Sequence, residues 1–187
     1  MMNVPGILNG NPKACSKVAA ALNLDKPVDG HAPLCTGADL EAYARAGIRT
    51  DHECTTTAEL WERISLGMYG SIREGSLARN LLPLIENLTA DLSRRCSFCT
   101  DDRHAADTVE RGHINGMLAM AVKAGMDEFD ALKAITINPA EHIGVADRVG
   151  SLEVGKDADV VVTAGCPFEV MTETRAVFID GNRVDTL

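Results

Sequence analysis

Ionisable side chains gather in three short clusters of this 187-residue chain, which read DGH at 29–31, TDHE at 50–53 and TDDRH at 100–104. Two histidines and a carboxylate are suitable ligands for a divalent metal, because imidazole nitrogen and carboxylate oxygen bind borderline and hard cations. Any one histidine alone would more often be a polar residue of a helix-capping turn. Three clusters at equivalent places favour a metal site instead, provided that the fold brings them together.

The elements that would position these clusters alternate between strand and helix. Four strands are expected at 26–31, 48–52, 68–74 and 96–100, and each cluster comes at the end of one of them. Helices are expected over 37–47, 56–67, 76–88, 107–124 and 127–137. This alternation is typical of parallel strands joined by right-handed crossovers. Since the carboxyl ends of parallel strands lie on one side of an α/β fold, His31, His52 and an aspartate should converge there.

Side-chain alternation along a strand selects the aspartate. On the last strand Asp101 lies on the face opposite to the bulky Phe98, which should pack under the outer helices. Asp101 is therefore expected to face the site. The same alternation directs His52 toward the site and turns Asp51 away from it.

The composition of the sequence changes at about residue 150. Two later stretches, 154–163 and 176–184, are rich in valine and isoleucine, and the second contains the hairpin turn signal Asp180-Gly181. This tail is expected to form antiparallel β structure in a different layer, whereas His142 before it is expected to be structural. The predicted division of the chain is into residues 1–149 and 150–187.

Composition excludes several classes of protein. An apolar fraction of 45% with 24% charged residues is that of an ordinary soluble globular protein. A net charge of -9 argues against nucleic acid as a partner, because no basic patch is dense enough to displace counterions. No segment approaches the roughly 20 apolar residues needed to span a bilayer. With no secretory signal and six scattered cysteines, a cytoplasmic location with reduced thiols is the default expectation.

Five blocks of the sequence resemble the bacterial adenine deaminases of the amidohydrolase superfamily. They are PGILNGNP at 5–12, KPVDGHAP at 26–33, AYARAGIRTDHECTT at 42–56, LGMYGSIREGSLARN at 66–80 and RRCSFCTDDRH at 94–104. The later INPAEHIG at 137–144 is similar to the return of the superfamily into its small β domain. The resemblance implies an α/β fold, namely part of a metal-dependent (β/α)8 TIM-type barrel, with strands 5 to 8 and their helices. A short β segment of the small composite β domain would follow.

The resemblance also implies an activity, the hydrolysis of adenine to hypoxanthine and ammonia. His31, His52 and Asp101 match metal ligands of a centre that is binuclear in the complete enzyme and holds manganese or iron. Asp101 would also move the proton toward the departing amine, and Glu53 would assist catalysis beside a ligand. Four further residues are expected to contact the purine: Arg73, Glu74, Asp102 and His104.

The chain departs from the family pattern in its first part. The H-x-H pair of the first strand is absent, and so is the bridging glutamate expected just before Met1-Met2-Asn3. The amino-terminal half of the barrel is therefore expected to be missing, which predicts weak metal binding and association with identical chains or with the missing half. Two alternatives stay open. The chain could belong to an amidohydrolase acting on a cyclic amide or imidazolone, or it could be a non-catalytic half of a split barrel.

Overall fold

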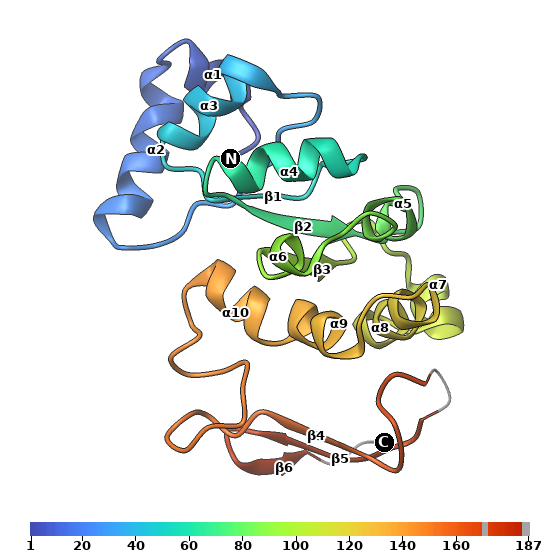
Figure 1. The fold of residues 1–187 in the computed structure, drawn as a ribbon. Coiled ribbons are helices and arrows are strands. Elements are labelled where there is room, and N and C mark those ends of the chain that lie inside the picture. Colours follow the sequence, from blue (N-terminus) through green and yellow to red (C-terminus); the bar gives the residue numbers. More distant parts are fainter. Residues whose placement is uncertain (170–171, 185–187) are drawn as a thin grey trace.

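The computed structural model describes residues 1–169 and 172–184, and its centre is a small parallel sheet (Figure 1). The sheet has the order β1 (Thr50–Asp51), β2 (Tyr69–Arg73) and β3 (Cys96–Cys99), with all strands parallel. The predicted alternation is confirmed at these three strands. Sequence neighbours are also neighbours in the sheet, so the carboxyl ends of all three strands meet at one edge.

The strand predicted over 26–31 is wrong in extent. Only Val28 pairs, through an isolated parallel bridge to Ile48, and Arg49 donates a backbone hydrogen bond to the Val28 carbonyl at 2.8 Å. Pro27 has no N–H to give to a ladder, and from Asp29 onward side chains, not strand pairing, hold the chain. The segment nevertheless runs beside β1 and brings His31 to the edge of the sheet.

Helices cover the sheet, and two of them end as predicted. α3 (Gly37–Arg45) is followed by Gly47 at φ +101°, and α4 (Thr57–Ser65) by Gly67 at φ +82°, a backbone conformation that favours glycine. α4 begins with the capping box that the spacing of Thr56 and Glu59 predicts.

The long helix predicted over 76–88 is wrong. Glu74 forms an antiparallel bridge with Arg79, so residues 75–80 make a loop that turns back on itself. Helix α5 (Leu81–Ile85) begins five residues after the predicted start. Pro83 lies in its first turn, where the missing N–H is tolerated, so this proline does not kink a longer helix. A further short helix, α6 (Ala90–Ser93), leads into β3.

Of the two helical stretches predicted after β3, the first is divided and the second is confirmed. The first corresponds to α7 (Ala105–Arg111) and α8 (Ile114–Lys123), separated at Gly112, where φ is +76°. The second corresponds to α9 (Glu128–Ile135), and α10 (Ile137–Ile143) follows it after Thr136, beyond the predicted range. Two amino-terminal helices, α1 (Val4–Leu8) and α2 (Pro12–Asn23), were not expected from the sequence.

The buried apolar side chains form two clusters. The first packs α4, α5, α8 and α9 against β2 and β3, around Leu60, Ile72, Phe98 and Met117. The second packs α1, α2 and α3 against the His31 segment, around Leu40, Tyr43 and Ile48. The segment that carries His31 thus belongs to one core and β2 and β3 to the other, and β1 lies between them.

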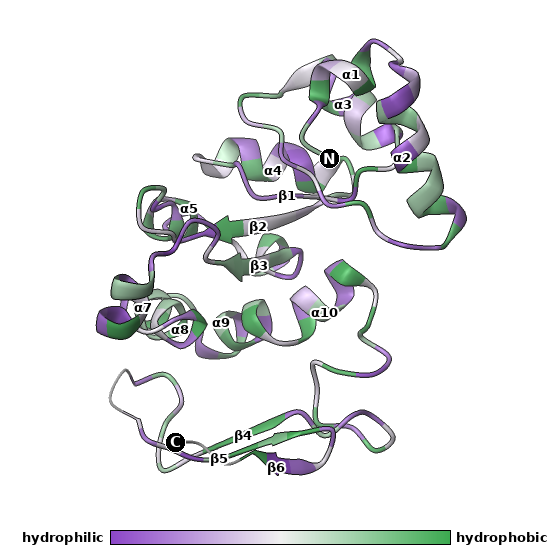
Figure 2. Ribbon diagram, turned by 180° about the vertical axis from the view of Figure 1, so that it is seen from behind, coloured by the Kyte–Doolittle hydropathy of each residue, from purple (hydrophilic) through white to green (hydrophobic). Residues whose placement is uncertain are grey.

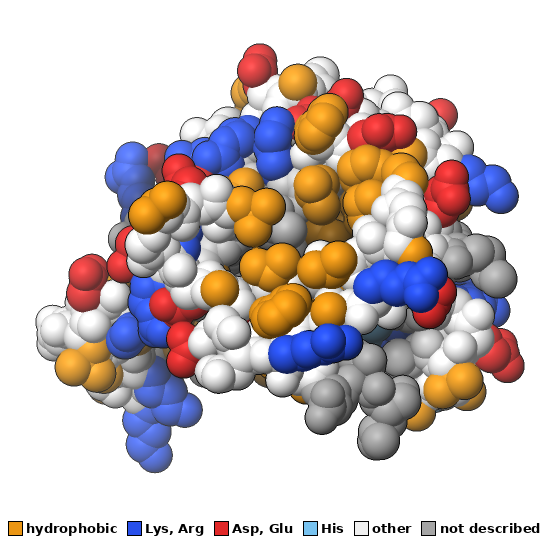
Figure 3. All heavy atoms as spheres, turned by 90° about the horizontal axis from the view of Figure 1, so that it is seen from below, with side chains coloured by type: hydrophobic (Ala, Val, Ile, Leu, Met, Phe, Trp, Pro, Cys, Tyr) orange, Lys and Arg blue, Asp and Glu red, His pale blue; other side chains and the backbone are white. Residues whose placement is uncertain are grey.

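A separate antiparallel sheet follows the helices, with the order β4 (Val160–Thr163), β5 (Thr174–Ile179) and β6 (Asn182–Val184). The predicted hairpin at Asp180-Gly181 is confirmed, with φ of +51° and +73°. Strands β4 and β5 are largely apolar (Figure 2). Among the described residues after His142 none is buried, and apolar side chains gather on the surface seen from the side of this sheet (Figure 3).

No helix in the described part of the chain has the length and apolar character needed to cross a membrane.

His142, on α10, is only 3% exposed, and its ring centroid lies 4.2 Å from that of Tyr69. Its Nδ1 lies 2.9 Å from the Ser97 hydroxyl oxygen, while Nε2 is buried with no hydrogen-bond partner among the described residues. His142 is therefore a structural residue, as predicted, and burial lowers its pKa to about 4.

We expect His142 to make folding sensitive to acid. Below pH 6.5 the unfolded chain protonates this imidazole, whereas the folded chain keeps it neutral down to about pH 4. The stabilisation present above pH 6.5 is therefore lost as the pH falls toward 4, on the order of 2 kcal/mol. In urea unfolding at several pH values, His142→Asn should flatten this part of the profile, and His113→Asn, at an exposed histidine, should not. Parallel profiles for wild type and His142→Asn would contradict the assignment.

Candidate metal centre

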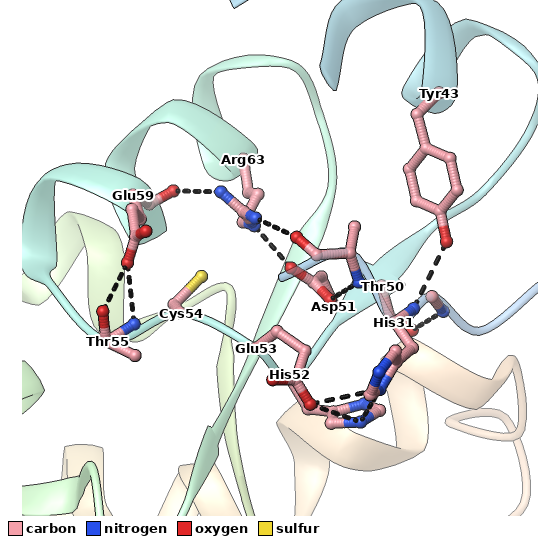
Figure 4. A network of polar contacts seen from close by, with 12 residues as sticks. His31, Tyr43, Thr50, Asp51, His52, Glu53, Cys54, Thr55, Glu59 and Arg63 are labelled. Atoms are coloured by element: carbon pink, nitrogen blue, oxygen red, sulfur yellow. Dashed lines mark hydrogen bonds and ion pairs between the residues drawn. The ribbon is translucent and has the colours of Figure 1, made fainter. Parts of the chain in front are cut away.

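Three side chains from two neighbouring segments converge at the carboxyl edge of the parallel sheet. His31 follows the Val28 bridge, and His52 and Glu53 directly follow β1. His31 Nδ1 lies 3.2 Å from His52 Nε2 and 3.1 Å from Glu53 Oε1, and His52 Nε2 lies 3.4 Å from the same carboxylate oxygen. Figure 4 shows both imidazole rings and the carboxylate pointing toward one another.

The donor set fits a divalent metal. One ligand atom from each of the three residues lies within 4.8 Å of the others, and the three side chains are 10% to 30% exposed. Two imidazoles and a carboxylate are ligands that zinc, manganese and iron share. In residues 1–169 and 172–184 no second group of three such side chains meets the same criterion. The predicted convergence of His31 and His52 is present in the structure.

Arg73 extends the group to the next strand. It ends β2, and its guanidinium donates to Glu53 through NH1 at 2.6 Å and NH2 at 3.2 Å. NH1 also donates to Asp101 Oδ2 at 2.9 Å. Burial would lower the pKa of Arg73, but the hydrogen bonds with Asp101 and Glu53 raise it above its ordinary value. The arginine thus remains a cation held between two carboxylates.

Asp101 lies beside this group and is not within it. Strand β3 ends at Cys99, and Asp101 has a left-handed backbone with φ +46°. Its side chain is 43% exposed and contacts the guanidinium of Arg73, so it reaches the histidines only through Arg73 and Glu53. The simple alternation that selected Asp101 stops at the strand end, and the turn sets its direction.

The other predicted substrate residues surround the neighbouring loop 75–80. Glu74 Oε2 accepts from the Leu81 amide at 3.1 Å, and burial raises the pKa of this carboxyl. Asp102 Oδ2 accepts from the Leu77 amide at 2.8 Å, and the His104 amide donates to the Ser76 hydroxyl at 2.9 Å. Glu74 also lines a cavity of about 440 Å³ between α5 and α8. In the structure these three residues contact the loop, not the two histidines.

A buried ion pair beneath the histidines was missed by the sequence reasoning. Asp51 and Arg63 are both fully buried, and Arg63 Nε donates to Asp51 Oδ2 at 2.6 Å. Asp51 does turn away from the histidines, as alternation predicts, and toward α4. The signal for Arg63 was its spacing, because it follows the core residue Leu60 by three positions and so shares the buried face of that helix.

Comparison with known proteins gives matches along most of the chain. The amidohydrolase family matches residues 11–184. An adenine deaminase of Nitratidesulfovibrio vulgaris (strain DP4) is 49% identical over 162 residues, which are 87% of this chain and 28% of that protein. An adenine deaminase of Desulfatibacillum aliphaticivorans is 45% identical over the same shares of the two chains. The crystal structure of an amidohydrolase from Thermotoga maritima is similar at a TM-score of 0.63 and 27% identity, over 85% of this chain and 43% of that one.

These matches confirm the resemblance to bacterial adenine deaminases that the sequence blocks predict. The chain spans about 28% of the length of the curated relatives that it matches. The matched region nonetheless contains both histidine segments, the three parallel strands and the later antiparallel sheet. Sequence and fold agree over most of the chain, and it belongs to the amidohydrolase family.

Proposed function

We propose that this chain is part of a metal-dependent adenine deaminase, which hydrolyses adenine to hypoxanthine and ammonia. The observation that carries the proposal is the convergence of His31, His52 and Glu53 at the carboxyl edge of a parallel sheet, within a chain 49% identical to a protein named adenine deaminase. This edge is where α/β folds place their catalytic groups.

We further propose that residues 1–149 are the carboxyl-terminal half of a (β/α)8 barrel, with strands 5 to 8 and their helices, and that residues 150–187 belong to a small β domain. The parallel strands in sequence order support this division, as do the covering helices and the separate antiparallel sheet. In such an arrangement the outermost strand of the sheet needs a partner, because an unpaired strand leaves backbone groups without hydrogen bonds. That partner would be an amino-terminal barrel half or a second copy of the chain, in the reducing cytoplasm that the six free cysteines suit.

The metal would be a divalent transition ion, manganese or iron, and His31 and His52 would hold it, with Asp101 contributing to a binuclear centre in the complete enzyme. A divalent ion in such a site supplies Lewis acidity, which lowers the pKa of water to near neutrality. Glu53 fits the donor set as closely as the histidines and is a third candidate ligand.

The protein groups around the metal position have distinct roles in this proposal. Asp101, 43% exposed at the mouth, can accept a proton and deliver it to the departing amine, and Glu53 can assist from the inner side. Arg73 bonds to both carboxylates and so keeps them oriented. The candidates for purine contacts remain Arg73, Glu74, Asp102 and His104. Arg73 has the most support, because it bonds to Glu53 beside the two histidines.

Removal of either histidine should weaken metal binding. Calorimetric titration of the chain with Mn²⁺ should show binding that His31→Ala and His52→Ala each reduce by at least tenfold, because each variant removes one nitrogen ligand. His113→Ala removes an exposed imidazole outside the group and should bind like wild type. Equal binding by His52→Ala and His113→Ala would place the ion elsewhere.

Deamination should depend on the same residues. The chain joined with the amino-terminal segment of the N. vulgaris relative, and loaded with Mn²⁺, should release ammonia from adenine. Asp101→Asn should lower kcat by about 10² to 10⁴-fold, since it removes a proton carrier while keeping size and hydrogen-bonding capacity. An assembled, metal-loaded protein that is inactive on adenine but opens a cyclic amide would support the other amidohydrolase activity. Failure with both substrates would favour a non-catalytic half.

A further inference from the structure

We propose that the buried Asp51–Arg63 pair is a positioning device that fixes the spacing of His31 and His52 before a metal binds. The inference rests on the proposed metal site and assigns a role to two residues that do not themselves touch the metal position. Asp51 immediately precedes His52, and the pair also binds both backbone groups of Ala32, which immediately follows His31.

Four hydrogen bonds make this connection. Arg63 Nε donates to Asp51 Oδ2 at 2.6 Å, and Arg63 NH2 donates to the Ala32 carbonyl at 2.9 Å. The Ala32 amide donates to Asp51 Oδ1 at 3.0 Å, which closes a ring between the His31 segment and β1. Arg63 NH1 donates to the Glu59 carbonyl at 3.2 Å and so anchors the ring to α4. Figure 4 shows the pair between α4 and the two histidines.

The His31 segment needs such an anchor because strand pairing does not hold it. Its last paired residue is Val28, three residues before the histidine, and the partner of Val28 is Ile48, just before β1. Two further bonds hold the segment: the Gly30 amide donates to the Thr50 hydroxyl of β1 at 3.3 Å, and the His31 amide donates to the Tyr43 hydroxyl of α3 at 3.2 Å. A Cβ on Gly30 would lie 2.1 Å from the Thr50 carbonyl oxygen, so the approach is close enough to exclude any other residue.

The chemistry of the pair suits positioning better than it suits stability alone. Burial of two charges costs solvation free energy that their attraction offsets only in good geometry, so such a pair adds little net stability compared with apolar residues. A guanidinium, however, presents a rigid planar fork of donors, and here it reaches a side chain of β1 and a carbonyl of the His31 segment together. A lysine at the same place would keep the charge and lose that fork.

Arg63→Lys and the neutral double variant Asp51→Asn with Arg63→Met test the role. Binding of Co²⁺ to the full 187-residue chain should be measured by calorimetry and by visible absorption, at a temperature where circular dichroism shows every variant folded. Both variants should bind at least tenfold more weakly, the range known for residues that orient metal ligands, and should give an altered Co²⁺ spectrum. Leu60→Ala is the matched control, because Leu60 is equally buried on the same helix and belongs to the other core. It should unfold at a lower temperature and keep wild-type affinity and spectrum.

Wild-type affinity and spectrum in both folded variants would overturn the inference while leaving the metal site intact. If neither variant folds, the pair is a requirement of the fold, and the positioning role is wrong. If Co²⁺ binds to wild type no better than to His31→Ala, the proposed metal site itself fails and this inference fails with it. Weaker binding by Leu60→Ala as well would show that lost stability is the cause, and would also contradict the role assigned to the pair.

Discussion

The site depends on one constraint, which is that a segment without strand pairing must lie tightly against the end of a short strand. Strand β1 contains only Thr50 and Asp51, and the segment before it pairs with Ile48 through Val28 alone. Side chains therefore do what a longer ladder would do. Thr50 and Asp51 bond to the amides of Gly30 and Ala32, and the two histidines, 21 residues apart in sequence, come within 3.2 Å.

Two arginines pair with carboxylates of the site, one in its buried interior and one at its mouth. Arg63 neutralises Asp51 where neither is exposed, and Arg73 neutralises Glu53 where both side chains are about one-tenth exposed. Between them lie the imidazoles of His31 and His52, both in contact with Glu53. Because Glu53 contacts both histidines and Arg73, a cation at the histidines would share this carboxylate with the guanidinium. The site thus has an inner part held by hydrogen bonds to backbone groups and an outer part held by contacts between side chains.

Much of this arrangement could be predicted from the sequence, because it follows from strand order. Apolar runs and helix signals were enough to predict strands at 48–52, 68–74 and 96–100. The geometry of parallel sheets was then enough to predict the convergence of His31 with His52. The place of Asp101 could not be predicted in the same way, since alternation holds only inside a strand and β3 ends at Cys99. The burial of Arg63 could have been inferred from its position three residues after Leu60, but only tertiary contacts show which carboxylate it meets.

The central claim is that His31 and His52 form a metal site in this member of the amidohydrolase family. A crystal of the chain grown with Mn²⁺, with anomalous diffraction measured near the manganese edge, tests it most directly. We expect an anomalous peak at the carboxyl end of β1, in contact with ring nitrogens of both histidines, above an unchanged Asp51–Arg63 pair. A peak bound only elsewhere, or a fully occupied ion with the His31 segment withdrawn from β1, would contradict it.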